Sequence, residues 1–392
     1  MTEHRSPAQI AALGLLALAL AMGIGRFAFT PLFPMMQQDG TLDISGGSLL
    51  AAANFLGYWM GALSAAALPL PPRNTLRLAL LATGIVTAAM GLTDAYWLWL
   101  ALRWLAGLFS AWTLIVVSNH VVKALADAGE TRRQGWVFAG VGSGIALAGL
   151  ACLGFMVAGF SANASWLALG GGTLGLAGLL SFLIGPEVPS VRRNAGEGAV
   201  EKAPLVWRVV IAYGVMGLGY IIPATYLPLM AREIVSDPLV FGWSWPVFGL
   251  AAALSTVAAR NLFARYGNRP VWAAAQAVMA LGLVLPALLP HMATIVLSGL
   301  LVGGTFMVVT MAGMKETHVI APPGDVSRHI AVLTAAFATG QIAGPPAASF
   351  LHGLTGSFSA GLLAAAVLLL LTALPIAIAR SYAASRGTAP TP

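Results

Sequence analysis

Twelve apolar stretches occupy most of the chain, and they constrain its fold more than any other feature. Each has about 20 residues or more, the length that an α-helix needs to cross a bilayer core about 30 Å thick. The stretches comprise residues 10–36, 45–70, 76–93, 96–122, 136–160, 164–184, 206–231, 239–259, 270–290, 293–314, 329–351 and 358–379. Only 8% of the residues are charged, whereas soluble domains carry roughly 25%. The sequence therefore predicts an all-α membrane protein with twelve transmembrane helices.

The lysines and arginines predict how the chain lies in the membrane. All of them except Arg26, Arg103 and Arg232 fall in loops or termini on the side of the N-terminus. The opposite loops contain Arg232 and five acidic residues: Asp39, Asp43, Asp94, Glu233 and Asp237. Because basic loops stay on the cytoplasmic side, we expect a multi-pass protein of the bacterial inner membrane with both termini in the cytoplasm. The net charge of +7 is explained by topology, so no nucleic-acid partner is predicted.

The two halves of the chain resemble each other. The segment from Met22 to Met36 aligns with the segment from Met216 to Met230 at an offset of 194 residues, and both contain a Met-Gly-x-Gly start and a proline near the end. At an offset of 196, three further pairs match: Gly107 with Gly303, Gly144 with Gly340, and Arg73 with Arg269. Six helices per copy give both copies the same orientation, which predicts parallel repeats about an axis along the membrane normal.

The polar segment 185–205 lies between the two copies. It contains most of the charged residues of the mid-chain region, so we expect a cytoplasmic linker there. The sequence thus predicts a six-helix bundle at 1–184, a linker at 185–205 and a second six-helix bundle at 206–392.

Several short motifs resemble those of the major facilitator superfamily (MFS). Arg103-Trp104-Leu105-Ala106-Gly107 is similar to its arginine-x-x-glutamine-glycine motif, with alanine in place of glutamine. Ala264-Arg265-Tyr266-Gly267-Asn268-Arg269 resembles its loop motif but lacks the aspartate, and Gly340-Gln341-Ile342-Ala343-Gly344-Pro345 resembles its glycine-proline motif. More narrowly, Gly23–Pro34 and Asn54–Tyr58 resemble the YbfB/YjiJ-like branch. The resemblance implies the MFS fold, secondary transport by alternating access, and a cavity lined by helices 1, 4, 7 and 10.

Two arginines in the apolar stretches are the first candidates for a binding site. Arg26 lies 16 residues past Ile10, about 24 Å along a helix, which is too deep for easy snorkelling. Charges inside a membrane are costly and usually functional, and a guanidinium can hold a carboxylate or phosphate with two hydrogen bonds. We expect Arg26 to bind an anion in the cavity, the alternative being a structural arginine tied to helix carbonyls or to Asn54. Arg103 is a second candidate, although it could also snorkel or pair with a polar neighbour.

Aromatic and amide side chains complete the predicted substrate site: Asn54, Tyr58, Trp112, Tyr220, Tyr226 and Gln341. Each could equally serve in packing or as an interfacial anchor. Glu316 and His120 occupy related positions at the inner ends of helices 10 and 4. They are candidates for an inner gate or proton-coupling pair, or else interfacial residues that face headgroups and loops.

The predicted function is secondary active transport of a small organic anion or related metabolite. A cationic-drug pump is disfavoured, because helix 1 offers an arginine where such carriers often need a carboxylate. The alternative is efflux of neutral or amphipathic toxic compounds, with the arginines structural. No histidine falls in a metal-ligand spacing and no nucleophile–base pair is visible, so no enzyme activity, cofactor or metal ion is predicted. The expected partners are a small-molecule substrate and the lipid bilayer, and the protein is expected to be a monomer.

Overall fold

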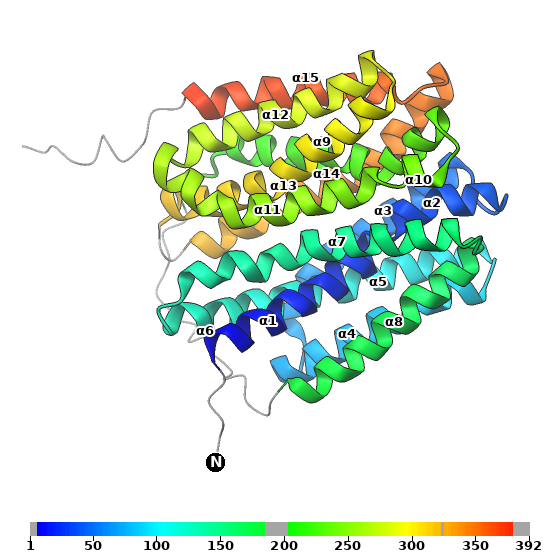
Figure 1. Ribbon diagram of the computed structural model, residues 1–392. Helices are drawn as coiled ribbons and strands as arrows, with labels where there is room; N and C mark the ends of the chain where they lie inside the picture. Colours follow the sequence, from blue (N-terminus) through cyan, green and yellow to red (C-terminus); the bar gives the residue numbers. More distant parts are fainter. Residues whose placement is uncertain (1–5, 185–202, 323–324, 379–392) are drawn as a thin grey trace, which may run out of the picture.

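The computed structural model describes residues 6–184, 203–322 and 325–378, and all regular structure in these ranges is helical (Figure 1). The first half contains α1 (Pro7–Leu18), α2 (Phe29–Gln38), α3 (Ile44–Ser64), α4 (Pro72–Ala89), α5 (Tyr96–Val116), α6 (Val122–Asp127), α7 (Gln134–Val157) and α8 (Ala162–Leu183). The second half contains α9 (Trp207–Ile234), α10 (Pro238–Phe241), α11 (Ser244–Tyr266), α12 (Asn268–Leu288), α13 (Met292–Ile320), α14 (Val326–Thr355) and α15 (Ser359–Ile378). A π-helical segment (Ala19–Arg26) follows α1 and leads toward α2, and a second one (Val117–Val121) joins α5 to α6.

Eleven helices in the described ranges are long and apolar enough to span a membrane. Helix α3 supplies the twelfth crossing by its position and its 21 residues. Its several glycines and serines, together with Asn54, lower its hydropathy. Such a helix suits a bundle interior, where small residues allow close contact and polar groups find partners.

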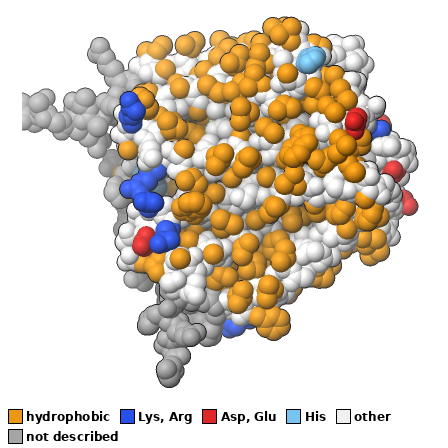
Figure 2. All heavy atoms as spheres, viewed as in Figure 1, with side chains coloured by type: hydrophobic (Ala, Val, Ile, Leu, Met, Phe, Trp, Pro, Cys, Tyr) orange, Lys and Arg blue, Asp and Glu red, His pale blue; other side chains and the backbone are white. Residues whose placement is uncertain are grey.

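The helices run side by side between two ends of the molecule (Figure 1). At one end α1 begins and α8 ends, and at the other α2 ends and α3 begins. Lysine and arginine side chains gather at the first end, which we name the basic end, and most visible acidic side chains at the second, the acidic end (Figure 2). Hydrophobic side chains cover the broad surface between them (Figure 2), as expected for a surface in contact with lipid chains.

Contacts between the two halves follow three pairs of helices. Helix α7 packs along α11, α3 packs along α14, and α2 packs on α9. Gly142 of α7 and Gly249 of α11 meet so closely that a Cβ on either would collide with the main chain of the other helix. Small residues therefore allow the two halves to approach backbone to backbone.

The chain just after the predicted linker is fixed to the second half. The amide of Ala203 donates to Asp325, and Arg328 bonds both to Asp325 and to the carbonyl of Ala203. The Arg328 guanidinium holds the pKa of Asp325 well below its usual value, at about 2. Most of the predicted linker, residues 185–202, lies outside the described residues.

The first membrane-spanning segment is broken near its middle, whereas the sequence predicts one helix over 10–36. The π-helical segment ends at Arg26, and α2 begins only at Phe29. Pro31 and Pro34 lack N–H groups, and a proline ring clashes with the carbonyl four residues earlier. In a regular α-helix the amide of Thr30 would bond to the carbonyl of Arg26, but it bonds to the carbonyl of Phe27 instead. In a π-helix the partner of the Arg26 carbonyl would be residue 31, and Pro31 has no amide hydrogen. The break therefore leaves main-chain acceptors for side chains of other helices to satisfy.

Candidate functional site

Arg26 lies at this break, with only 3% of its surface exposed. Its Nη2 donates a hydrogen bond of 2.7 Å to Oε1 of Gln341 on α14, across the interface between the halves. The Gln341 amide nitrogen in turn donates to the Tyr220 hydroxyl on α9. Three of the predicted site residues therefore form one continuous polar chain in the middle of the bundle.

Aromatic rings surround the Arg26 guanidinium on the side of the first half. Its Cζ lies 4.0 Å from the centroid of the Tyr58 ring and 5.2 Å from those of Phe55 and Phe27. Cation–π contact with desolvated rings stabilises a buried guanidinium. It does not neutralise the charge, so the cation remains able to bind an anion.

Arg103 has a different set of partners. Its Nη1 and Nη2 donate to the carbonyls of Gly25 and Arg26, at 3.1 and 2.8 Å, at the break in the first helix. The side chain is 2% exposed. Arg103 therefore supplies donors to main-chain acceptors at the break, and by holding that main chain it positions Arg26.

Asn54 supports Arg103 from the neighbouring helix. Its Nδ2 donates to the carbonyl of Arg103 at 2.8 Å, and the side chain is fully buried. Helices α3 and α5 approach so closely that a Cβ on Gly57 or Gly107 would collide with main-chain atoms of the other helix. Asn54 thus contacts Arg103, the residue that positions Arg26, and it is linked to Arg26 through Arg103.

Neither buried arginine has a carboxylate partner in the described part of the chain. The ion pairs found there join Arg133 to Glu130, Arg269 to Glu316, and Arg328 and His329 to Asp325. The Nε atoms of Arg26 and Arg103 are buried and have no hydrogen-bond partner among the described residues. Burying an unpaired ion costs several kcal/mol by order of magnitude. The site therefore holds excess positive charge that an anion would compensate.

Two predicted site residues lie elsewhere. Trp112 donates through Nε1 to Ser64 at 3.0 Å, beyond Arg103 toward the basic end. The Tyr226 hydroxyl donates to the carbonyl of Pro345 at 2.9 Å, and its ring packs on Phe358 toward the acidic end. Their hydrogen bonds support helix packing, and neither side chain is bonded to the Arg26–Gln341–Tyr220 chain.

Sequence reasoning missed the phenylalanines of this region. Phe27 and Phe55 contact Arg26, while Phe306 and Phe337 stack on Tyr220. The signal for Phe27 and Phe55 was present, since both occur within the motifs that carry the family resemblance. Phe306 and Phe337 resemble ordinary core residues in sequence.

A family model described as "Uncharacterised MFS-type transporter YbfB" matches residues 18–377, which is nearly the whole chain. The chain belongs to this family of MFS-type transporters. The sequence-based predictions of a transporter with the MFS fold, and of no enzyme activity, are therefore confirmed. No curated protein matches the sequence.

Solved structures of other MFS-type transporters share the fold. The nucleoside transporter NupG is 16% identical, with a TM-score of 0.71 over 94% of this chain and 98% of its own. The human organic anion transporter MFSD10 (TETRAN) is 16% identical, with a TM-score of 0.65 over 95% and 100%. A bacterial homologue of the human lysosomal transporter Spinster is 13% identical, with a TM-score of 0.70 over 97% and 96%. At these identities the likeness concerns the fold alone.

In this MFS-type transporter the two halves are joined on the acidic side of Arg26. The Thr30 hydroxyl donates to the carbonyl of Ala224 at 2.6 Å, and Arg232 donates to the carbonyl of Pro34. The Ala224 carbonyl is available because residue 228 is a proline without an N–H group. These bonds tie the two halves together between Arg26 and the acidic end.

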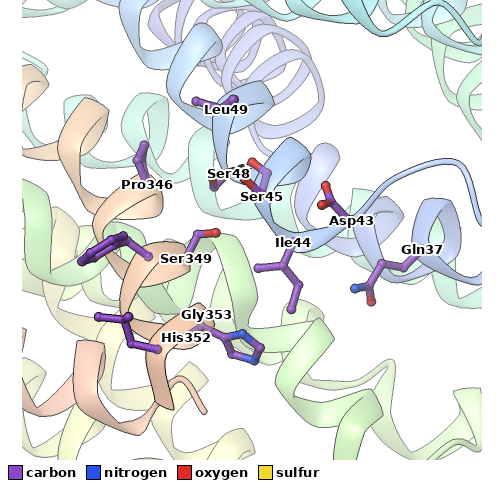
Figure 3. Close-up of a pocket in the computed structure, with 12 residues that line it drawn as sticks. Gln37, Asp43, Ile44, Ser45, Ser48, Leu49, Pro346, Ser349, His352 and Gly353 are labelled. Atoms are coloured by element: carbon purple, nitrogen blue, oxygen red, sulfur yellow. Dashed lines mark hydrogen bonds between the residues drawn. The ribbon is translucent and has the colours of Figure 1, made fainter. Parts of the chain in front are cut away.

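A cavity of about 730 Å³ lies toward the acidic end, between the start of α3 and the last turns of α14 (Figure 3). Its polar lining includes Asp43, Ser45, Ser349 and His352. Asp43 already caps α3 by accepting from the amide of Gly46, and His352 packs against Phe358. None of the residues that line the cavity belongs to the Arg26 cluster, and two of its polar side chains have local structural roles.

The predicted gate residues of the transporter have local partners. Glu316 is 2% exposed, accepts from Arg269 Nε at 2.7 Å and accepts from Asn268 at 2.9 Å. The Nδ1 of His120 lies 3.1 Å from the carbonyl of Val116 in its own helix. Among the described contacts none joins His120 to Glu316. Glu316 thus ties α13 to the start of α12, and a joint role with His120 stays a prediction.

Proposed function

We propose that this transporter carries a small organic anion across the bacterial inner membrane by alternating access, with Arg26 as the main anion ligand. The observation that carries the proposal is the guanidinium of Arg26, buried in the middle of the bundle without a carboxylate partner among the residues that the structure describes. Its hydrogen-bond acceptor is a neutral amide, Gln341. A carboxylate in that place would form a stronger, charge-assisted bond.

The position of the cluster between the halves supports alternating access. Arg26 belongs to the first half, whereas Gln341 and Tyr220 belong to the second. A substrate bound there contacts both halves, so rocking of one half against the other changes access around a fixed site. The bonds from Thr30 and Arg232 then represent one closed side of that cycle.

The test uses purified full-length protein and its thermal stability. A ligand present at 100 times its dissociation constant stabilises the folded state by about 2.7 kcal/mol. Small organic carboxylates and phosphates should therefore raise the melting temperature, and their neutral amide analogues should not. The rise should be absent in Arg26→Met and preserved in Arg265→Met, which removes an exposed arginine.

The outcomes separate the anion carrier from its main alternative. Efflux of neutral or amphipathic compounds predicts stabilisation by uncharged ligands that survives in Arg26→Met. That result would refute the anion proposal. Saturable uptake with counterflow in proteoliposomes would support a carrier, whereas flux without counterflow would indicate a channel.

The orientation is also proposed: both termini and the linker lie in the cytoplasm, and the protein acts as a monomer. The proposed orientation is supported by the difference in charge between the two ends (Figure 2), together with the positive-inside rule. Reporter fusions after Glu197 and near Ser161 should read as cytoplasmic and periplasmic, respectively. A periplasmic signal at the linker would contradict this orientation.

A further inference from the structure

The cavity at the acidic end changes in character along the two helices that form it (Figure 3). Asp43 caps the start of α3, and His352 lies in the last turn of α14. Leu49 and Pro346 line the cavity six residues further inside the same helices, which is about 9 Å deeper along each helix axis. The cavity is therefore polar at the helix ends and apolar toward the middle of the bundle.

One side of this cavity reaches the surface that faces lipid. Leu49 of α3 is 47% exposed, and Phe350 and Leu354 of α14 are each 68% exposed. All three line the cavity and belong to helices that cross the membrane, so their exposed surfaces contact lipid chains. An acyl chain outside the bundle can therefore be continuous with a polar group inside the cavity.

The polar side chains suit a headgroup that carries both signs of charge. Asp43 uses Oδ1 to accept from the amide of Gly46, so Oδ2 can accept from an ammonium group. Ser349 and His352 of α14 point toward the start of α3 (Figure 3). Their O–H and N–H groups are donors of the kind that bind a phosphate. An acceptor for a cation and donors for an anion thus lie on opposite walls of one cavity.

We propose that the cavity binds a phospholipid whose headgroup contains a phosphate and a primary ammonium, taken from the leaflet at the acidic end. The ammonium bonds to Asp43, the phosphate bonds to Ser349 and His352, and the acyl chains lie over the exposed apolar side chains. The volume of about 730 Å³ falls within the range of about 300–1,000 Å³ that is typical of small-molecule sites. The lipid site is independent of the anion site, because no residue of the Arg26 cluster lines this cavity.

Other ligands match only part of these surroundings. A soluble amine would pair with Asp43 and leave the apolar side of the cavity uncovered. An anionic phospholipid would bring its charge near Asp43 without an ammonium to compensate it, and like charges repel. A quaternary ammonium has no N–H group, whereas a primary ammonium has three donors, as in lysine. The primary ammonium therefore fits the carboxylate best.

The experiment measures lipid binding to the purified full-length protein in detergent by native mass spectrometry. Three probes share dioleoyl chains and differ in the headgroup: phosphatidylethanolamine, phosphatidylcholine and phosphatidylglycerol. The fourth probe is free phosphoethanolamine, which has the headgroup of the first lipid without its chains. It should bind more than 100-fold more weakly than dioleoyl-phosphatidylethanolamine, because each buried methylene adds to the affinity.

A matched pair of aspartates tests the headgroup. Asp43→Asn removes the charge and keeps a residue that caps helices well. Asp237→Asn is the control, because Asp237 also caps a helix at the acidic end, accepts from the amide of Leu239 and does not line the cavity. Phosphatidylethanolamine affinity should fall about fivefold in Asp43→Asn, the size of an exposed ion pair, and stay at the wild-type value in Asp237→Asn. Phosphatidylglycerol and phosphatidylcholine affinities should not fall in either variant.

A matched pair of phenylalanines tests the acyl chains. Phe350→Ala removes an exposed apolar side chain that lines the cavity and should lower the affinity for phosphatidylethanolamine. Phe182→Ala is the control, because Phe182 is 87% exposed and lies outside the cavity. Equal affinities in these two variants would refute the placement of the chains.

The remaining outcomes decide the identity of the ligand. Equal phosphatidylethanolamine affinity in Asp43→Asn and Asp237→Asn would overturn the role of Asp43 and with it the headgroup assignment. A fall in phosphatidylglycerol affinity as large as that for phosphatidylethanolamine would refute recognition of the ammonium. Free phosphoethanolamine that binds as tightly as the lipid would show that the cavity takes a soluble compound and refute the lipid site. This last comparison uses the wild-type protein alone, so it holds even where a variant folds poorly.

Discussion

The two buried arginines should respond in opposite ways to the same substitution. Arg103→Met removes two charge-assisted hydrogen bonds to main-chain carbonyls, at 3.1 and 2.8 Å. Hydrogen bonds to charged groups contribute about 1.5–3 kcal/mol each, so the gross loss is about 3–6 kcal/mol. Relief from burying the cation offsets part of it. We expect the free energy of unfolding to fall by about 3 kcal/mol.

Arg26→Met removes a single hydrogen bond to an amide side chain. The hydrogen bond contributes about 1.5–3 kcal/mol, and the cation–π contact with Tyr58, which is also lost, contributes about 2 kcal/mol when desolvated. Both losses are opposed by relief from burying a cation that has no carboxylate partner among the described residues, which is several kcal/mol by order of magnitude. The stability of Arg26→Met should therefore stay within about 1 kcal/mol of wild type, because these terms nearly cancel. Binding of the anion should be lost.

The assay is the melting temperature of the purified variants in one detergent, measured beside anion binding. Arg265→Met controls for the loss of one positive charge at an exposed position. Arg103→Lys should recover part of the stability, since an ammonium can donate to one of the two carbonyls. Equal destabilisation by Arg26→Met and Arg103→Met would refute the reasoning, because it would show that both arginines are structural.

Four further variants test the site and the bonds around it. Gln341→Glu places a carboxylate against Arg26, and the attraction between unit charges about 4 Å apart is about 4 kcal/mol. Anion affinity should therefore fall more than 100-fold without loss of thermal stability. Unchanged affinity would exclude Arg26 as the ligand. Thr30→Val removes one bond between the halves and should raise labelling of a reporter thiol on the acidic side about fivefold; unchanged labelling would show that this bond does not hold the closure. Glu316→Gln should lower the free energy of unfolding by about 3 kcal/mol, whereas His120→Ala should have little effect on it. If transport still depends steeply on the proton gradient in both variants, the two residues are excluded from proton coupling.

The fold was largely predictable because its main determinant is local. A run of about 20 apolar residues is sufficient to indicate a membrane helix, and even α3, which contains Asn54 and several glycines, was recognised. Ends were less accurate. The tenth helix was predicted to end at residue 314 and continues to Ile320, because Glu316 finds partners in Asn268 and Arg269 that no local pattern reveals.

The candidate site was predictable in composition but not in arrangement. Arg26 and Arg103 are equally conspicuous as charges in apolar stretches, yet one bonds to a side chain and the other to main-chain carbonyls. This difference depends on the rotation of α5 toward the break after Arg26, which sequence spacing does not specify. Tyr226 is similar: six residues from Tyr220, it lies about 9 Å further along the helix and bonds to Pro345 instead.

The contact between Thr30 and Ala224 joins positions separated by 194 residues, the offset at which the two copies of the sequence align. A position that meets its own counterpart lies on the axis that relates the copies. At such a point identical residues are poor hydrogen-bond partners, because a donor in one copy would face the same donor in the other. Each residue would have to act as donor and acceptor at once. A hydroxyl opposite a bare carbonyl avoids that conflict. The symmetry of the duplication must therefore be broken where the halves touch on the axis, even though it is retained in the helices around it.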